Sequence, residues 1–296
     1  MTKPHGIWPM LYAFFDEHDR LDEAAFRAQV RWCLATGCQG IAMLGLITEV
    51  GALTVEEKAR LTAWAAEEIG ARVPLLVTIK APDANAMIGE ALAARAIGAS
   101  YVIFQPPPVA QVDLLETFSR VFAEVPGDVG IQNAPEYLGI GLEPAEVTEL
   151  RRRHPNFSLM KGEGPVVMVK RFLDQLPPEM ATFNGRGGLE LVDNLVAGCA
   201  GMIPAPETLD VQLMIYHAVR AGDLARAAAL YRALLPYAVF SMQTIPVAIF
   251  YGKRAFLRRS GIANAGACRL PGLTEDPFFL SASERWLAGL TAVTNP

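Results

Sequence analysis

Short apolar stretches recur along the chain and are separated by longer segments of mixed polarity. The apolar stretches cover residues 7–15, 40–46, 73–79, 100–104, 129–132, 157–161, 180–184 and 201–203. Runs of this length are typical of buried strands. In most of the intervening segments the apolar residues recur with the helical period, at residues 22–35, 55–69, 84–97, 113–122 and 144–152. The pattern therefore predicts strands that alternate with helices.

The ends of the predicted helices carry capping residues. Thr54 stands where an N-cap is expected, and Glu57 follows three residues later, which is the spacing of a capping box. Gly37, Gly70 and Gly98 come directly after predicted helices, where a glycine readily ends a helix.

Eight strands that alternate with helices indicate a parallel sheet, because successive parallel strands need a crossover connection. Eight such units favour closure into a barrel. An open doubly wound sheet is the alternative, but it usually carries a glycine-rich nucleotide loop after its first strand. The segment YAFFDEHDR at that place contains no glycine. The predicted fold is therefore an α/β protein, a (β/α)8 TIM barrel.

The alternation stops near residue 223. Residues 223–240 and 246–261 have the pattern of consecutive helices, and a last helix is expected near residues 281–288. We therefore expect residues 1–222 to form the barrel with the active site and residues 223–296 to form a C-terminal helical region.

Composition narrows the class of function. Of the 296 residues, 52% are hydrophobic and 19% are charged, which suits a soluble globular protein with a large core. The net charge is −5, and the basic residues do not form a stripe, so nucleic acid is not an expected partner. The start MTKPHGIWPM lacks the pattern of a signal peptide, and no uncharged apolar window is long enough to span a membrane. We expect a cytoplasmic protein with no membrane partner.

Cysteine and histidine positions give no indication of a metal site. The four cysteines include no C-x-x-C pair, so we expect reduced thiols. None of the four histidines falls at the end of a predicted strand. We expect neither a metal nor a cofactor.

Candidate chemistry follows from the ends of the predicted strands, because the active site of a TIM barrel lies at the carboxyl ends of its strands. The residues at those ends are Thr48, Glu49, Gln105, Gln132, Asn133, Lys161, Glu163, Asn184, Gly185 and Arg186. Lys161 differs from the others because it ends an apolar stretch, FSLMK. Burial there disfavours the charged ammonium, and a neutral amine attacks carbonyl carbons to form a Schiff base. The alternative is a lysine that caps the barrel mouth or pairs with Glu163.

Several longer stretches carry a family resemblance that covers almost the whole chain. They are GIWPMLYAFFDEHDRLDEAAF, GIAMLGLITEVGALTVEEK, RVPLLVTI, VGIQNAPEYLGIGLEP, FNGRGGLELVDNLVAGCAGMIP and AGDLARAAALYRALLP, together with the strand of Lys161. They resemble the pyruvate-type class I lyases, the superfamily of dihydrodipicolinate synthase and N-acetylneuraminate lyase. The resemblance implies that Lys161 is the Schiff-base lysine, that the substrate is a small 2-oxo acid, and that the chain forms a homotetramer built as a dimer of dimers.

The chain departs from the family pattern around the expected site. The family's carboxylate-binding stretch Gly-Thr-Thr-Gly-Glu reads Gly-Leu-Ile-Thr-Glu at residues 45–49. The family's proton-transferring tyrosine on strand 5 is Gln132, and its tyrosine pair after strand 4 is absent. The arginine with which the synthase holds its second substrate falls at Tyr137. Dihydrodipicolinate synthesis would therefore lack its proton relay and its second-substrate anchor.

Within the superfamily, these departures resemble the bacterial 2-keto-3-deoxy-L-arabonate dehydratases and their relatives. Those proteins carry Ser-Glu where this chain has Thr48 and Glu49, and a Gln-x-Ala-Pro run like residues 132–135. They also have a glutamate two places after the lysine, like Glu163. The resemblance implies a 2-keto-3-deoxy sugar acid as the substrate.

The expected reaction starts with condensation of the lysine with the C2 ketone. Loss of a C3 proton then gives an enamine, from which either the C4 hydroxyl leaves as water or the C3–C4 bond breaks. A glutamate or the substrate carboxylate is the candidate proton acceptor, and a glutamine can only orient groups by hydrogen bonds. The expected catalytic residues are Lys161, Gln132 and Glu163, and the expected substrate-binding residues are Thr48, Ile47, Asn133, Gly185, Arg186 and Ile203.

Most of these residues have a structural alternative. Glu163 either acts in catalysis or forms a salt bridge at the strand end. Thr48 binds the substrate carboxylate or caps its loop, and Arg186 binds the far end of the substrate or turns outward. For Asn133 and Glu49 the alternative is that each holds its own turn or loop. Two other functions also stay open, namely pyruvate condensation or aldol chemistry as in the wider family, and a catalytically quiet sensor of small carboxylates.

Overall fold

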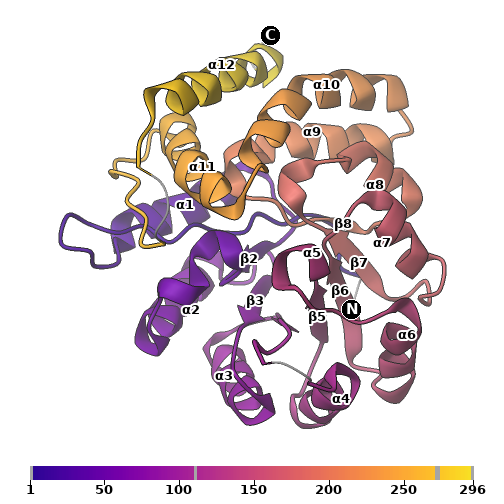
Figure 1. Cartoon of the computed structure of the whole chain (residues 1–296). Coiled ribbons are helices and arrows are strands. Elements are labelled where there is room, and N and C mark those ends of the chain that lie inside the picture. The colour runs from indigo at the N-terminus through magenta and orange to yellow at the C-terminus, as the bar shows by residue number, and fades with distance from the viewer. Residues whose placement is uncertain (1–2, 110–111, 271–273, 295–296) are drawn as a thin grey trace.

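Within residues 3–109, 112–270 and 274–294, which the computed structural model describes, eight parallel strands form the centre of the molecule and helices surround them (Figure 1). The strands are β1 (Gly6–Ile7), β2 (Ile41–Met43), β3 (Leu75–Ile79), β4 (Tyr101–Phe104), β5 (Val129–Asn133), β6 (Phe157–Gly162), β7 (Ala181–Asn184) and β8 (Gly201–Met202). Their order is β1-β8-β7-β6-β5-β4-β3-β2, in which neighbours in sequence are neighbours in the sheet. The predicted TIM barrel is confirmed.

The segment after β1 closes the barrel between β8 and β2. The Met10 N–H donates to the Pro204 carbonyl at 2.7 Å, and the Leu11 N–H donates to the Ala42 carbonyl of β2 at 2.9 Å. The regular strand is much shorter than the predicted stretch 7–15, because the backbone partners change along the stretch. The rest of that stretch is buried, and its backbone bonds first to the segment after β8 and then to β2.

The helices begin and end largely where the pattern predicts. They are α1 (Glu23–Thr36), α2 (Val55–Ile69), α3 (Ala84–Ile97), α4 (Leu114–Glu124), α5 (Pro135–Leu138), α6 (Pro144–Arg153), α7 (Val166–Leu173), α8 (Leu191–Ala197), α9 (Leu209–Arg220), α10 (Leu224–Ser241), α11 (Ile245–Ser260) and α12 (Pro277–Thr294), with 3-10 turns η1 (Leu46–Thr48), η2 (Val50–Ala52), η3 (Arg186–Gly188) and η4 (Pro206–Thr208). Thr54 and Glu57 form the predicted capping box. Gly37 and Gly98 end their helices with positive φ, as predicted.

Side chains along each strand alternate between two layers of the core. Leu159 packs with Trp8 and Phe183 in an inner cluster inside the barrel, whereas Met160 belongs to the outer cluster between the strands and the helices. Because successive strand residues point to opposite faces, Lys161 lies on the same side as Leu159. The strand thus directs the lysine into the top of the barrel.

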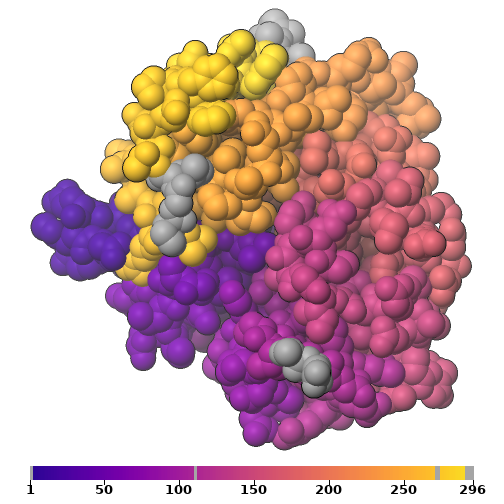
Figure 2. Space-filling model, viewed as in Figure 1, coloured from indigo at the N-terminus to yellow at the C-terminus, as the bar shows by residue number. Residues whose placement is uncertain are grey.

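The C-terminal helices pack across one side of the barrel. α10 lies against α9 and α12, and α11 lies against η1 and η4, the turns that follow β2 and β8. Figure 2 shows these helices in orange and yellow as one continuous surface with the barrel, while the loop near residues 16–20 protrudes. The last helix is longer than the predicted residues 281–288. None of the helices in the described ranges combines the length and apolarity needed to cross a membrane.

Candidate active site

A cavity lies at the carboxyl end of the barrel. Five of the predicted site residues line it, namely Ile47, Lys161, Glu163, Arg186 and Ile203. Further lining residues that sequence reasoning missed include Glu207, Ser241 and Met242. The cavity is therefore built from strand ends, the loops after them, and the C-terminal helices.

Lys161 and Glu163 form an ion pair in the wall of this cavity. Lys161 Nζ lies 3.0 Å from Glu163 Oε1, and the two side chains are only 6% and 9% exposed. A buried charge is costly unless it has a partner, so each group makes the other tolerable in this place. The arrangement holds an amine in a nearly dry cavity with a carboxylate that can accept a proton.

Gln132 holds the second oxygen of Glu163, and Gln105 in turn holds Gln132. Gln105 Nε2 donates to Gln132 Oε1 at 3.0 Å, and Gln132 Nε2 donates to Glu163 Oε2 at 2.5 Å. All three side chains are buried. The first bond fixes the amide of Gln132 with its NH2 group toward Glu163, so Gln132 acts as the predicted orienting group for that carboxylate. Gln105 lies at the end of β4, as predicted, but is not among the predicted catalytic or substrate-binding residues.

Gly185 leaves the space that Glu163 occupies. A Cβ atom on residue 185 would lie 2.1 Å from Glu163 Oε1, well inside van der Waals contact. Any side chain at this position would displace the carboxylate from Lys161. The structure thus gives Gly185 a steric role beside Glu163, and substrate binding by Gly185 stays a prediction.

Arg186 reaches the cavity from the turn after β7. Its Nη1 lies 3.0 Å from Glu190 Oε2, and its Nε has no hydrogen-bond partner among the described residues. Burial raises the pKa of the Tyr137 hydroxyl, and a hydrogen bond with Arg186 opposes that rise. The side chain is 17% exposed and does not turn outward. Arg186 therefore brings a cation to the part of the mouth where Tyr137 replaces the arginine of the synthase.

The loop after β2 presents Ile47 to the cavity and turns its polar residues away. The Thr48 hydroxyl donates to the Leu11 carbonyl at 2.7 Å, and Thr48 is fully buried. Glu49 Oε1 lies 2.6 Å from Lys253 Nζ, and both side chains are fully buried. These contacts favour the alternatives in which Thr48 and Glu49 hold the loop.

Asn133 also holds a turn. Its side chain donates to the Leu142 carbonyl at 2.9 Å and accepts from the Leu142 N–H at 2.8 Å. This pair of bonds fixes the loop between β5 and α6 and uses both ends of the amide. The contacts favour the structural alternative for Asn133, and substrate binding by this residue stays a prediction.

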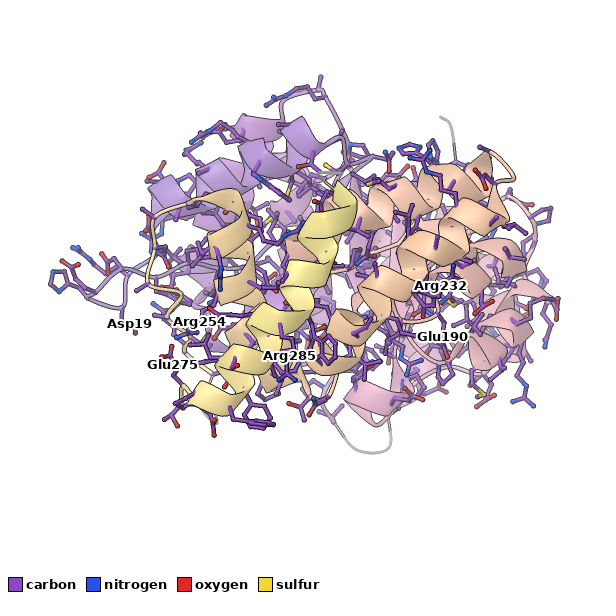
Figure 3. The ribbon with its side chains drawn as sticks, turned by 90° about the horizontal axis from the view of Figure 1, so that it is seen from above. Asp19, Glu190, Arg232, Arg254, Glu275 and Arg285 are labelled. Atoms are coloured by element: carbon purple, nitrogen blue, oxygen red, sulfur yellow. The ribbon has the colours of Figure 1, made fainter. Side chains whose placement is uncertain are left out.

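The C-terminal helices supply a wall that the sequence pattern could not place. Ser241 is the last residue of α10 and Met242 follows it, and both line the cavity together with Ala248 of α11. Figure 3, seen from above, shows the helices of this region crossing the molecule, with Arg254 on α11 near Glu275. The two side chains are 3.6 Å apart. Such contacts join segments that are distant in sequence.

Glu207 is a second carboxyl group at the cavity and was missed. It lies on η4, four residues beyond Ile203, so the strand-end rule applied one turn further would have found it. Tyr12 Oη donates to Glu207 Oε2 at 2.9 Å. Burial raises the pKa of Glu207 to about 7, and hydrogen bonds from its own N–H and from Tyr12 offset only part of the rise.

Comparison with known proteins places this geometry in a family. Residues 3–277 match the model of the Dihydrodipicolinate synthetase family. The L-2-keto-3-deoxyarabonate dehydratase of Azospirillum brasilense is 27% identical over 240 residues, which cover 78% of this chain and 77% of that protein. An Escherichia coli K12 protein named "Probable 2-dehydro-3-deoxy-D-pentonate aldolase YjhH" is 27% identical over 254 residues, covering 82% and 84%.

A solved structure supports the same assignment of the fold. The crystal structure of YagE, a family protein from Escherichia coli K12 in complex with pyruvate, matches with a TM-score of 0.90 at 23% identity, covering 97% of this chain and 98% of that one. The family model spans most of the chain, and the named relatives are lyases. The chain is therefore a lyase that belongs to the Dihydrodipicolinate synthetase family.

Proposed function

We propose that this lyase acts through a Schiff base between Lys161 and the C2 carbon of a 2-keto-3-deoxy sugar acid, and that it removes the C4 hydroxyl as water. The observation that carries the proposal is the buried pair of Lys161 and Glu163, 3.0 Å apart in the cavity wall. A lysine in this setting has a proton acceptor beside it and little water around it, which are the conditions for a nucleophilic amine.

The reaction follows from these contacts. The amine of Lys161 adds to C2, and the former carbonyl oxygen leaves as water, which gives an iminium ion. Glu163 then accepts a proton from C3, and the electrons of the C3–H bond form an enamine. Gln132 keeps the carboxylate of Glu163 in place during this transfer. Loss of the C4 hydroxyl leaves a C3–C4 double bond conjugated with the iminium ion. Loss of a C5 proton and return of a proton to C3 then turn C4 and C5 into an enol, which becomes the aldehyde when its hydroxyl proton is lost and C4 is protonated. Hydrolysis of the iminium ion releases the semialdehyde and restores Lys161.

The remaining lining residues suit the rest of such a substrate. Arg186 offers a guanidinium group to a carboxylate or hydroxyl of the sugar acid. Ile47 and Ile203 give apolar contacts on either side of the lysine. Thr48 and Asn133 are proposed to shape the walls through their bonds to Leu11 and Leu142.

Aldol cleavage between C3 and C4 is the second candidate reaction. It is favoured by the printed name of the Escherichia coli relative, just as dehydration is favoured by the name of the Azospirillum brasilense relative. Both reactions share the Schiff base and the enamine. Dihydrodipicolinate synthesis is disfavoured, because Gln132 stands in place of the tyrosine relay and Tyr137 in place of the arginine.

Borohydride trapping tests the Schiff base. Incubation of the protein with pyruvate and sodium borohydride is expected to add the mass of one reduced ligand at Lys161, located by peptide mass spectrometry. Lys161→Ala is expected to abolish the adduct. Lys170→Ala, which changes an exposed lysine on α7, serves as the matched control and is expected to retain it. Absence of any adduct with pyruvate or other 2-oxo acids would overturn the proposed function.

Product analysis separates the two reactions. The protein is incubated with both enantiomers of 2-keto-3-deoxypentonate, and the products are identified by mass spectrometry. Dehydration keeps the carbon chain intact and gives a semialdehyde, whereas cleavage releases free pyruvate. We expect the semialdehyde.

The proposal extends to the state of the protein. We expect a cytoplasmic homotetramer built as a dimer of dimers, as in the resembled superfamily, with residues 1–222 as the barrel and residues 223–296 as the C-terminal helical region. The three buried cysteines, Cys33, Cys38 and Cys199, are all unpaired, which supports a reducing compartment. Sedimentation velocity on the purified protein tests the tetramer, since a monomer or dimer at micromolar concentration would contradict it.

A further inference from the structure

Glu207 lines the cavity from the turn after β8, two strands along the barrel from β6, which carries Lys161. It lies on η4 and lines the cavity together with Lys161, Glu163 and Arg186, yet only 4% of its surface is exposed. A substrate bound through C2 to Lys161 must extend C3 and C4 into this cavity. The residues that it can meet there include Glu207.

No cation bonds to the Glu207 carboxyl group among the described residues, although the charge of Arg259 lowers the pKa of that group in part. Arg259 forms a bidentate pair with Asp210 at 2.9 and 2.7 Å and donates to the backbone carbonyl of Glu207, not to its carboxyl group. Among the described residues the only side chain bonded to that carboxyl group is Tyr12. A carboxyl group in this position is not committed to the ionised form.

Tyr12 can satisfy both protonation states of Glu207. Its hydroxyl lies 2.9 Å from Glu207 Oε2 and 3.4 Å from the Ala248 carbonyl. When Glu207 is ionised, Tyr12 donates to the carboxylate. When Glu207 is protonated, the acid can donate to the Tyr12 oxygen while Tyr12 donates to Ala248. The pocket therefore accommodates loss and return of a proton without leaving a buried polar atom unpaired.

Glu163 and Glu207 thus have complementary environments. Glu163 Oε1 lies 3.0 Å from Lys161 Nζ, and Glu163 Oε2 accepts a hydrogen bond from the amide of Gln132. Glu207 is desolvated and receives a hydroxyl, and burial raises its pKa to about 7. Two carboxyl groups whose neighbours differ in this way are suited to the roles of base and acid in one reaction.

We propose that Glu207 is the catalytic acid that protonates the departing C4 hydroxyl, with Tyr12 as the residue that positions it. This inference rests on the proposed function. In the step, the enamine electrons re-form the iminium bond at C2, the C2–C3 electrons form a C3–C4 double bond, and the C4–O bond breaks. The oxygen takes the proton of Glu207 and leaves as water. Glu207 becomes a carboxylate and regains its proton from solvent.

Glu207→Gln tests the assignment because it keeps the shape and removes the acid. With 2-keto-3-deoxypentonate we expect kcat for dehydration to fall about 100-fold or more, the usual size of a general-acid contribution. Borohydride trapping of pyruvate at Lys161 and exchange of the C3 protons of pyruvate in D2O are expected to persist, because both precede the acid step. Glu284→Gln, on the exposed face of α12, is the matched control and is expected to leave kcat unchanged.

A substrate analogue gives a second readout that a structural role would not produce. Fluoride leaves carbon without needing a proton, so a 2-oxo acid with fluorine in place of the C4 hydroxyl is expected to lose fluoride at rates within about threefold in the wild type and in Glu207→Gln. A fluoride electrode measures the release.

The possible results separate this inference from the proposed function. Dehydration by Glu207→Gln at the wild-type rate, or equal losses with the hydroxyl and fluorine substrates, would overturn the role of Glu207. Cleavage to pyruvate by the wild type instead of dehydration would also overturn it while leaving the Schiff base intact. Absence of trapping in the wild type would overturn the proposed function itself.

Discussion

At the scale of single residues, the charges of the cavity are set by their immediate neighbours. Glu163 lies 3.0 Å from an ammonium nitrogen and 2.5 Å from an amide nitrogen, whereas Glu207 receives only a tyrosine hydroxyl and its own N–H. Burial raises the pKa of Glu207 to about 7, although the hydrogen bonds and the charge of Arg259 oppose part of that rise. The same residue type therefore has two different sets of neighbours in one cavity.

The raised pKa of Glu207 predicts a pH-dependent stability. Its pKa is 4.5 in the unfolded chain and about 7 in the folded protein. Between these values the folded state holds a proton that the unfolded state releases. The free energy of unfolding therefore falls as pH rises from about 4.5 to about 7, by about 3 kcal/mol from this group, and then levels off.

Urea unfolding of the wild type and of Glu207→Gln at pH 5 and at pH 8 measures this contribution. The variant lacks the titrating group, so the wild type is expected to lose more stability than the variant between the two pH values. Equal losses in both proteins would show that Glu207 ionises normally in the folded state.

Gly185→Ala is expected to inactivate the site without unfolding the protein. The added Cβ would lie 2.1 Å from Glu163 Oε1 and would push the carboxylate away from Lys161. The three atoms nearest to the added Cβ all belong to the Glu163 side chain, so the clash itself is local. We expect kcat to fall at least tenfold while the protein still folds. Gly89→Ala on α3 is the control, because nothing lies within 4 Å of its Cβ position, and full activity of Gly185→Ala would contradict the steric role.

At the scale of elements, a buried ion pair ties the loop after β2 to α11. Lys253 and Glu49 are 2.6 Å apart and fully buried, and the N–H groups of Arg269 and Leu270 donate to the other carboxylate oxygen. Removing one partner leaves a buried charge, so Lys253→Met is expected to destabilise the protein by about 3–5 kcal/mol.

A surface pair provides the control for Lys253→Met in urea unfolding. Arg258 on α11 pairs with Glu284, and both side chains are exposed. Arg258→Met is expected to cost less than about 1 kcal/mol. The double variant Glu49→Gln with Lys253→Met should recover part of the loss, and a similar cost for both single variants would contradict the importance of burial.

Elements with strong local signals could be predicted from the sequence, and irregular ones could not. The start of α2 was predictable because Thr54 and Glu57 satisfy the free N–H groups of its first turn. The prediction of a continuous strand over residues 7–15 was wrong. The length of β1 is set by its hydrogen-bond partners on both sides and not by the residues of the stretch. The turns η1 and η4 gave no periodic signal at all.

The residues of the candidate site also fall into two groups, those that could be predicted from the sequence and those that could not. The carboxyl ends of all strands of a barrel lie at one face, whatever the conformation of the loops. For this reason the sequence could predict Lys161, Glu163 and Gln132. Glu207 lies in a short turn beyond its strand, and Ser241 and Met242 reach the cavity through helix packing. Such positions depend on contacts between distant segments, which hydrophobic periodicity does not encode.

At the scale of the whole molecule, the C-terminal helices complete the cavity and the core together. Ser241, Met242 and Ala248 form part of the cavity wall, and α11 supplies the only cation that pairs with Glu49 among the described residues. α10 also covers α9, whose buried face includes Leu213 and Tyr216. Residues 1–222, if made alone, would therefore expose apolar surface that α10 covers and would leave the Glu49 carboxylate without Lys253.

A chain that ends at residue 222 is accordingly expected to lose the site, even if it keeps helical structure. We expect no borohydride adduct with pyruvate, and strong binding of a dye that reports exposed apolar surface. A chain that ends at residue 276 is the matched control, because none of the described residues of α12 lines the cavity. It should still form the adduct at Lys161, with a lower melting temperature because α12 packs on α10 and α11. Trapping by the shorter chain at the full-length rate would show that the barrel alone assembles the site and that the helices only cover it.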